Sequence, residues 1–322
     1  MEKPKLIILT GPTAVGKSDL SIALAKKVDG EIISADSVQV YRGLDIGSAK
    51  IRPEEMQGVK HYLIDVLDPK DDFDITIFQR MAKDAMAEIY AKGKIPILVG
   101  GTGFYIQSIV YDIDFNDGAS DVTYRKELEE TAKTTDGIHD LYERLRSVDP
   151  KSAEAIHENN VKRVIRALEF YRATGKKISE HNEAERKKGS PYNFAYFVLN
   201  DDRTKLYERI DRRVDLMVKE GLLEEVKHLT ENGSAIGDTA MQGLGYKEIV
   251  RYLNGEYDLD RAIYLIKRET RHFAKRQITW FKREKDVHWL NKPDFDYDDE
   301  KILDEMIRVL EEKHLLCPGG EE

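Results

Sequence analysis

The residues most able to do chemistry are a lysine, a serine and a threonine in a glycine-rich run near the start of the chain. The run is Gly11-Pro12-Thr13-Ala14-Val15-Gly16-Lys17-Ser18, and it lies between an apolar stretch at 6–9 and a helix-like stretch that begins at Asp19. In that setting backbone N–H groups wrap phosphate oxygens at a helix N-terminus. Lys17 adds a positive charge, and the Ser18 hydroxyl is a ligand for Mg²⁺. The run predicts a site for a diphosphate or a triphosphate.

A carboxylate follows the second predicted strand. Residues 31–34 are apolar enough to form a strand, and they lead into Ala35-Asp36-Ser37. Because ligands of open α/β sheets bind beyond the carboxyl ends of the strands, we expect Asp36 to lie beside the phosphate loop. There it would hold Mg²⁺ through water or accept a proton from a nucleophile. The alternative is a loop aspartate that only caps a turn.

A second glycine-rich turn, Gly100-Gly101-Thr102-Gly103, follows an apolar strand at 95–99. It either brings backbone close to a ligand or is simply a tight turn. Enzymes that hydrolyse ATP usually place an aspartate after such a strand to hold Mg²⁺. Glycines stand there in this chain, although Asp65, within the run at 61–66, is available. The pattern disfavours a motor-type ATPase.

Two arginines stand four residues apart in a helix-like stretch at 203–219. Arg209 and Arg213 therefore share one helix face. A pair of guanidinium groups suits a pyrophosphate, whereas a surface ladder of ion pairs with Glu208 and Asp211 is the ordinary alternative. The spacing leaves both interpretations open.

Basic residues gather late in a chain whose net charge is −9. Residues 267–285 contain eight lysines and arginines against two glutamates, whereas 294–305 contain seven acidic residues and one lysine. The basic stretch also contains Phe273, Trp280 and Phe281. Basic groups follow a phosphate backbone and aromatic rings stack on unpaired bases, so the pattern favours an RNA partner. The alternative is a solvated helix face.

The order of predicted elements indicates an α/β core of the P-loop type, with a doubly wound parallel sheet and an inserted helical domain. Strand-like runs lie at 6–9, 31–34, 61–66, 95–99 and 193–199, with helix-like runs between them. The strand signal disappears at 113–191, where the predicted helices lie at 124–132, 138–148, 150–157 and 161–174. The highly charged stretch at 176–190 lacks apolar periodicity. We therefore expect a catalytic core of 1–112 and 192–290, an all-helical insertion at 113–191 and an acidic segment at 291–322.

Composition places the chain among soluble globular proteins. Its 322 residues are 41% hydrophobic and 34% charged, and the single cysteine, Cys317, excludes an intrachain disulfide and a cysteine metal cluster. The sequence shows no signal peptide and no apolar stretch of membrane-spanning length. We expect a cytoplasmic protein that has no membrane partner.

Taken together, these motifs resemble the tRNA dimethylallyltransferases. The segments that resemble family segments, in the family's order, are 11–18, 36–47, 100–105, 163–169, 243–246 and 275–280. Eukaryotic members often carry a C-terminal zinc finger, which Cys317 alone cannot form, so the chain looks like the bacterial form. The resemblance covers most of the chain.

This resemblance implies transfer of the dimethylallyl group of dimethylallyl diphosphate to N6 of adenosine 37, next to the anticodon of tRNA, with release of pyrophosphate. The phosphate loop would hold the diphosphate with Mg²⁺ on Ser18. Thr13, Lys17 and an arginine of the Arg209 and Arg213 pair would stabilise the leaving pyrophosphate, and Asp36 would be the general base. The enzyme is expected to act as a monomer on a flipped adenosine. The residues that match tRNA-contacting segments are Asp36, Ser37, Val38, Gln39, Thr102, Arg125, Lys162, Arg163, Val164, Ile165, Arg166, Gln242, Gly245, Tyr246, Lys275, Arg276, Gln277, Trp280 and Lys282.

Three other functions share some of these features. A P-loop kinase of small molecules has the loop and the aspartate, but it does not account for the helical insertion or the basic, aromatic helix. A prenyltransferase acting on free adenine nucleotides uses the same chemistry without tRNA. An RNA-binding nucleotide switch, which is not an enzyme, would change its tRNA affinity with nucleotide and modify no base.

Overall fold

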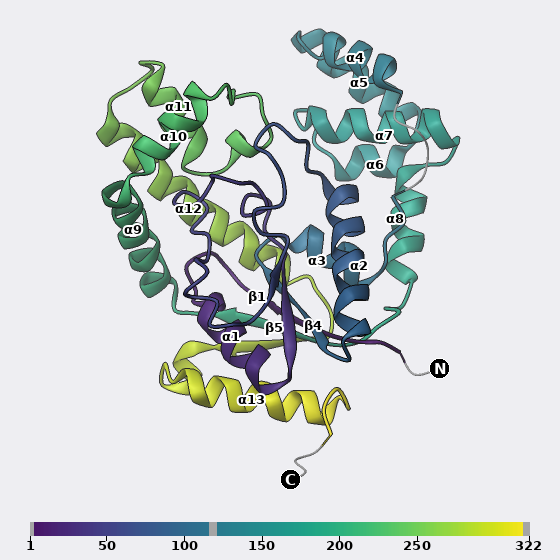
Figure 1. Ribbon diagram of the computed structural model, residues 1–322. Helices are drawn as coiled ribbons and strands as arrows, with labels where there is room; N and C mark the ends of the chain where they lie inside the picture. The colour runs from purple at the N-terminus through teal and green to yellow at the C-terminus, as the bar shows by residue number, and fades with distance from the viewer. Residues whose placement is uncertain (1–2, 116–120, 318–322) are drawn as a thin grey trace. The chain divides into compact units, whose positions relative to one another are not determined.

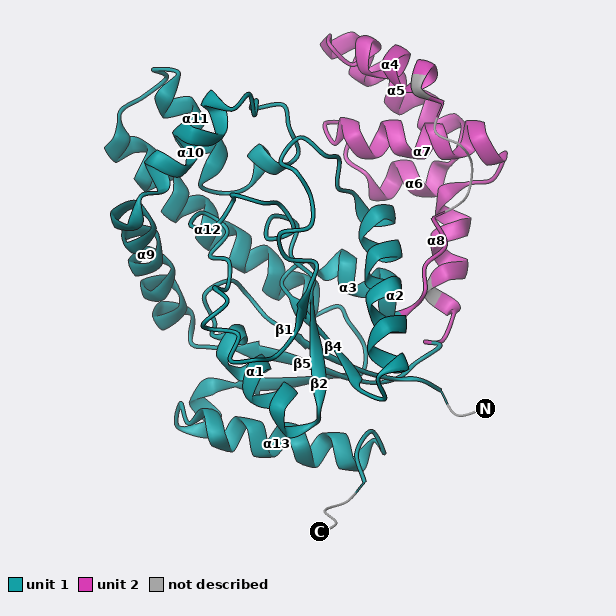
Figure 2. Cartoon of the chain, in the orientation of Figure 1, with its two compact units in different colours: residues 1–110, 191–322 teal, residues 111–190 magenta. Residues whose placement is uncertain are grey.

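The computed structural model describes residues 3–115 and 121–317, which form two compact units (Figure 2). Unit 1 consists of residues 1–110 and 191–322, and unit 2 consists of residues 111–190. Unit 2 is thus a continuous stretch of chain inserted between two parts of unit 1. In the described part of the chain, no helix combines the length and the apolarity needed to cross a membrane.

Unit 1 is built on a six-stranded parallel sheet in the order β3-β2-β4-β1-β5-β6. Its strands are β1 (Lys5–Thr10), β2 (Gly30–Ser34), β3 (His61–Tyr62), β4 (Ile95–Gly100), β5 (Asn193–Asn200) and β6 (Val287–Asn291). Because every neighbouring pair is parallel, the carboxyl ends of all six strands lie along one edge. This confirms the expected α/β core and brings together the loops that follow β1, β2 and β4.

Helices cover both faces of this sheet (Figure 1). Among the helices that pack on the strands are α1 (Lys17–Lys27), α2 (Ile75–Ala91), α3 (Gly103–Val110) and α13 (Asp299–Glu312). The two covered faces explain why the centre of β1 is apolar, with the side chains at 6–9 fully buried. Ile7 and Leu9 belong to one apolar cluster with residues of α1 and with Met306 of α13.

The remaining helices of unit 1 follow β5. They are α9 (Arg203–Glu220), α10 (Leu222–Glu231), α11 (Tyr246–Leu253), α12 (Leu259–Phe281) and the short 3-10 helices η1 (Ala240–Gln242) and η2 (Lys292–Phe295). Gly221 takes a left-handed backbone with φ 106°, which ends α9 and lets α10 begin at once. Helices α9 and α12 pack on each other, so their side chains can reach a common site.

Two stretches of unit 1 differ from the sequence-based expectation. The apolar run at 61–66 forms only the two-residue strand β3, because Leu63 and Asp65 have left-handed backbone with φ 62° and 55°. The acidic segment at 291–322 contains α13, whose Ile302 and Leu310 are buried in the core. Its acidic residues occupy the other face of the helix, so this segment adds a helix to the layer over the sheet.

Unit 2 is helical throughout its described residues. Its helices are α4 (Val122–Thr131), α5 (Thr135–Val148), α6 (Pro150–Ala155), α7 (Val161–Thr174) and α8 (Ile178–Lys187). Leu128, Leu145 and Leu168 lie in its own apolar core. Asp149 caps the start of α6, since it accepts a hydrogen bond from the backbone N–H of Ser152 at 3.2 Å.

The sequence pattern does not predict helix α8, because this helix has little apolar face. A polar contact holds the start of α8 in place. The Ser179 N–H and Oγ both donate to the buried carboxylate of Asp149, at 2.9 and 2.6 Å. These bonds satisfy groups at the helix N-terminus that otherwise lack a partner. A highly charged sequence is therefore helical for a tertiary reason.

Candidate active site

Three loops meet at the carboxyl edge of the sheet because β2, β4 and β1 are neighbours. The Thr102 N–H, after β4, donates to the Ala35 carbonyl at 3.3 Å, and Thr10 Oγ1, at the end of β1, donates to the Gly100 carbonyl at 2.7 Å. A Cβ on Gly100 would lie 2.3 Å from the Ala35 carbonyl oxygen, so this close approach requires glycine. The predicted residues Asp36 and Thr102 are thereby brought together beside the phosphate loop.

The phosphate loop has the strand–loop–helix geometry that its sequence predicts. Gly16, at φ 99°, precedes α1, and Gly11 packs so closely on β5 that a Cβ there would lie 2.2 Å from the Leu199 carbonyl oxygen. The Lys17 ammonium donates to the loop's own carbonyls, at 2.9 Å to Gly11 and 2.8 Å to Pro12. The side chain of Lys17 is therefore held against the backbone of the phosphate loop.

Lys17 lies in an electropositive and poorly hydrated environment. Burial, and to a lesser extent the charge of Arg213, lower the pKa of Lys17 to about 7, and the charge of Asp36 opposes both effects. Burial also lowers the pKa of Arg213, and Asp36 again opposes the shift. Two cations and one carboxylate, from three distant parts of the sequence, therefore share one site. Such a site favours a ligand that brings negative charge.

We expect pyrophosphate binding to weaken as the pH rises above 7. In the protein without ligand, the Lys17 ammonium loses its proton near pH 7. A bound anion favours the charged ammonium and raises its pKa. Binding above pH 7 therefore takes up a proton, and the dissociation constant should increase by up to about tenfold per pH unit. Calorimetry at several pH values, in buffers with different ionisation enthalpies, measures both effects. The Lys17→Met variant is the control, because its pH dependence contains only the ionisation of pyrophosphate; equal pH dependence in both proteins contradicts the prediction.

The structure distinguishes the two arginines that the sequence could not. Arg209 forms an ion pair with Asp201, whose side chain is fully buried after β5. Arg213, one turn further along α9, makes no ion pair within the described residues, and its charge acts on Lys17 and Asp36. Arg213 is thus the arginine of this pair whose charge reaches the phosphate loop, while Arg209 neutralises a buried carboxylate.

The carboxylate of Asp36 serves a turn and still has an oxygen available. Its Oδ1 accepts hydrogen bonds from the N–H groups of Val38 and Gln39, at 2.8 and 3.2 Å. Its Oδ2 accepts none from the part of the chain that the structure describes. The turn cap and the chemical function are therefore compatible. Asp65, the other aspartate considered for Mg²⁺, is instead engaged by the Lys50 ammonium.

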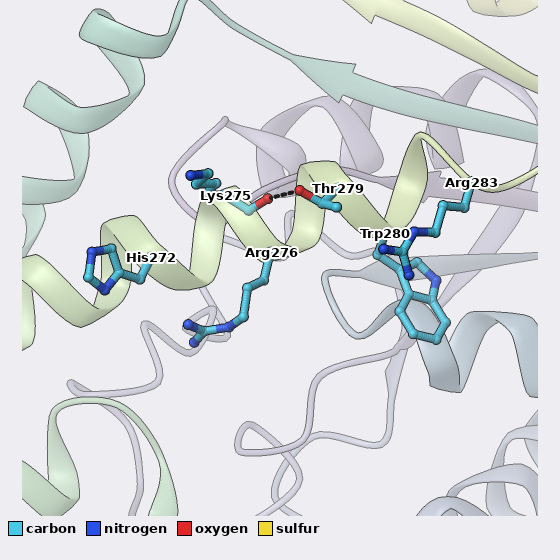
Figure 3. A pocket seen from close by; sticks show the side chains of 6 residues that line it. All are labelled: His272, Lys275, Arg276, Thr279, Trp280 and Arg283. Carbon is cyan, nitrogen blue, oxygen red and sulfur yellow. Dashed lines mark hydrogen bonds between the residues drawn. The ribbon is translucent and has the colours of Figure 1, made fainter. Parts of the chain in front are cut away.

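Helix α12 carries two kinds of basic residue. In its first half, Lys267 pairs with Asp215 and Arg271 pairs with Asp211, both on α9. From residue 275 to the turn just after the helix, no ion pair within the described residues engages the basic side chains, which are Lys275, Arg276, Lys282 and Arg283. Several of them line an open hollow of about 480 Å³ together with Trp280 (Figure 3). Unpaired cations beside an aromatic ring suit a nucleic-acid backbone and its bases.

In unit 2 the structure divides the residues that the resemblance assigned to tRNA. Lys162, Arg163 and Arg166 are exposed on α7, and the sequence between them, Val164-Ile165, is buried in the core of the unit. Arg125 donates to both carboxylate oxygens of Glu169 at 2.8 Å, so its guanidinium is already held by the protein. The basic side chains of α7 thus face solvent, whereas the guanidinium of Arg125 is paired.

Three assigned side chains of unit 1 are engaged by the protein itself. Tyr246 is fully buried with its hydroxyl on Glu225, Gln277 is 5% exposed, and the Gln39 amide lies between backbone and side-chain groups of its own loop. Ser37 and Gln242 remain exposed. The sequence pattern thus did not separate the assigned residues that face solvent from those that hold their segment in place.

Glu225 is a site-forming residue that the sequence did not reveal. Its carboxylate accepts hydrogen bonds from the backbone N–H groups of Asp45, Ile46 and Gly47, at 3.0, 2.7 and 3.1 Å. It thereby fixes the end of the segment that begins at Asp36. Because α10 was not predicted, no local signal could have indicated this carboxylate.

Comparison with known proteins identifies a matching family and several similar chains. The model of a family described as IPP transferase matches residues 39–284. A tRNA dimethylallyltransferase of Lachnoclostridium phytofermentans is 58% identical over 311 residues, 97% of this chain and 99% of that protein. The structure of the full-length tRNA isopentenylpyrophosphate transferase of Bacillus halodurans is 44% identical with a TM-score of 0.73, and the match covers 97% and 98% of the two chains. A eukaryotic dimethylallyltransferase acting on tRNA is 33% identical with a TM-score of 0.79, over 89% of this chain and 74% of that one.

Proposed function

Because the chain belongs to the IPP transferase family of tRNA dimethylallyltransferases, we propose that it transfers a dimethylallyl group from dimethylallyl diphosphate to N6 of adenosine 37 in tRNA. The observation that carries the proposal is the shared site of Lys17, Arg213 and Asp36, which joins an anion-binding loop to a carboxylate. The enzyme would act as a monomer in the cytoplasm, where tRNA is found.

The reaction needs help at both ends of the new bond. The N6 lone pair of adenine is delocalised into the ring, so the amine is a poor nucleophile. In the proposed step that lone pair forms the N–C bond, the allylic C–O bond breaks with its electron pair on pyrophosphate, and the N6 proton passes to Asp36. A general base and stabilisation of the leaving group are the two contributions that lower this barrier.

The leaving pyrophosphate gains negative charge, and the phosphate loop is arranged to receive it. Backbone N–H groups at the start of α1, the Lys17 ammonium and the Arg213 guanidinium are already in place before reaction, so little reorganisation is needed. The hydroxyl of Thr13 would add a further donor. Burial of Lys17 strengthens these interactions, because the local dielectric constant is low.

Magnesium fits this site only together with the diphosphate. The described residues contain no group of three or more acidic, histidine or cysteine side chains that could hold a metal, whereas Ser18 is exposed in the first turn of α1. Mg²⁺ commonly takes one or two protein ligands and completes its shell with phosphate oxygens and water. The Ser18 hydroxyl would be the protein ligand, and the ion would neutralise charge on the diphosphate.

The test is incubation of the protein with unmodified tRNA and labelled dimethylallyl diphosphate, followed by nucleoside analysis. We expect label on N6 of adenosine 37 and release of pyrophosphate. Equal labelling of free AMP would identify a prenyltransferase of free nucleotides. Tight ATP binding without binding of dimethylallyl diphosphate would identify a kinase. Nucleotide-dependent tRNA binding without any modified base would identify a switch.

We expect Arg276→Ala to weaken tRNA binding without changing pyrophosphate binding. Arg276 is exposed on α12 and lines the hollow with Trp280 (Figure 3), so its guanidinium is free to meet a phosphate. Log K for tRNA binding falls as log salt rises. The loss of one phosphate contact should make this slope less steep by about 0.7–0.9. Filter binding across a salt series measures this slope. Lys301→Ala on α13 removes the same charge elsewhere and serves as the control; an unchanged slope for Arg276→Ala contradicts the prediction.

A further inference from the structure

One buried amide connects the phosphate loop to the second glycine-rich turn. Gln277 of α12 is 5% exposed, its Oε1 accepts from the Thr13 N–H at 2.9 Å, and its Nε2 donates to the Gly101 carbonyl at 3.0 Å. Thr13 lies after β1 and Gly101 lies after β4, which are adjacent strands. The side chain therefore spans the two loops that would contact the diphosphate and the adenosine.

The second turn is shaped to receive this helix. A Cβ on Gly101 would lie 2.2 Å from Gln277 Nε2, and a Cβ on Gly103 would lie 2.2 Å from Trp280 Cδ1. Two glycines of the turn thus admit two side chains that stand three residues apart on α12. A glutamine that only filled space would not require a glycine at the position where its amide group contacts the backbone.

Because the Gln277 side chain is buried, the loss of either of its hydrogen bonds is costly. An amide removed from water without partners is costly, and loss of either bond also removes a partner from a partly buried backbone group of Thr13 or Gly101. Neighbouring Lys275 and Arg276 are exposed, so α12 presents its cations outward and this amide inward. The inward residue was assigned to tRNA by resemblance, yet it contacts the two loops.

We propose that Gln277 is a positioning residue that fixes Thr13 of the phosphate loop at a set distance from the Gly101–Thr102 turn. The inference rests on the proposed function, because it assigns the two loops to the diphosphate and the adenosine. Gln277 touches neither reactant; it acts through Thr13 on one side and through Gly101 on the other. Its contribution is the spacing between electrophile and acceptor, on which the rate of a bond-forming step depends.

Replacement by glutamate gives the proposal a pH signature. An ionised carboxylate only accepts hydrogen bonds, so Gln277→Glu keeps the bond from the Thr13 N–H but turns an oxygen toward the Gly101 carbonyl. A protonated carboxyl group has one O–H donor and restores both bonds. Burial raises the pKa of a carboxyl group, so the recovery should begin above its ordinary value of about 4.3. Gln277→Met has similar length and no polar group, and should not recover at any pH.

The experiment compares the full-length wild type, Gln277→Glu and Gln277→Met. At pH 8 we expect kcat/KM for dimethylallyl diphosphate to fall by about 5- to 100-fold in both variants, with tRNA affinity within about twofold of wild type. As the pH falls toward 5, the ratio to wild type should rise for Gln277→Glu alone. Gln57→Glu, at an exposed glutamine, controls for the added charge. Circular dichroism and urea unfolding establish that each variant is folded.

Two results would overturn the inference. The first is wild-type kcat/KM in both variants; the second is an equal loss in both variants at every pH, which indicates a structural contribution only. Pyrophosphate binding, measured alongside, separates this test from that of the proposed function. If the wild type modifies no tRNA, the proposed function fails, and weaker pyrophosphate binding by Gln277→Met, with recovery in Gln277→Glu at low pH, still supports the bridge between the loops.

Discussion

The Asp36→Asn variant is expected to lose about 10²- to 10⁴-fold in the rate of dimethylallyl transfer while it still binds tRNA, the range that general bases contribute. Asparagine retains an Oδ1 that accepts the hydrogen bonds from Val38 and Gln39, so the loop after β2 should keep its shape. What it lacks is the basicity needed to take the N6 proton. Asp36→Ala removes the base and the turn cap together and should abolish transfer.

Single-turnover assays with excess enzyme isolate this step, and tRNA binding is measured in parallel. The matched control is Asp65→Asn, which changes an aspartate at the same edge of the sheet that is paired with Lys50. It should keep the transfer rate of the wild type. Near-normal turnover by Asp36→Asn would remove Asp36 from the function of general base.

Local sequence was sufficient where a single segment contains all of the relevant physics. The phosphate loop was recognisable because the strand, the glycines at positive φ and the helix N-terminus are consecutive in the chain. The helices predicted at 161–174 and 150–157 are likewise bounded by local residues, since Gly175 ends the first with a left-handed backbone and Asp149 caps the start of the second. Asp36 could be placed because parallel strands put their carboxyl ends on one edge.

Sequence was insufficient where a partner from a distant segment decides the outcome. Gln277 lies in a basic stretch, and only its helical spacing with buried Ala274 and Phe281 indicates the inward face. That spacing predicts burial but does not predict that the amide joins Thr13 to Gly101. The hydrogen bonds of Glu225 and the start of helix α8 likewise depend on partners that are distant in the sequence, so no short window of sequence predicts them.

Arg213→Ala and Arg209→Ala should separate catalysis from stability on one helix face. Arg213 has no ion-pair partner among the described residues, and its charge acts on Lys17, so its removal should lower kcat by about 10²- to 10³-fold, as for other groups that stabilise developing negative charge. Because Arg213 also repels Lys17, its loss should raise the pKa of that lysine, and pyrophosphate binding should then weaken at a higher pH than in the wild type.

Arg209→Ala should instead lower the free energy of unfolding. It leaves Asp201 as an unpaired, fully buried carboxylate, and breaking such pairs costs about 3–5 kcal/mol. The side chain of Arg209 is 30% exposed, so water partly screens the pair and we expect a loss near 3 kcal/mol or less. Urea unfolding and single-turnover kinetics on both variants decide the assignment. A large loss of kcat in stable Arg209→Ala, with normal kcat in Arg213→Ala, would reverse it, because the pyrophosphate would then have to meet the guanidinium paired with Asp201.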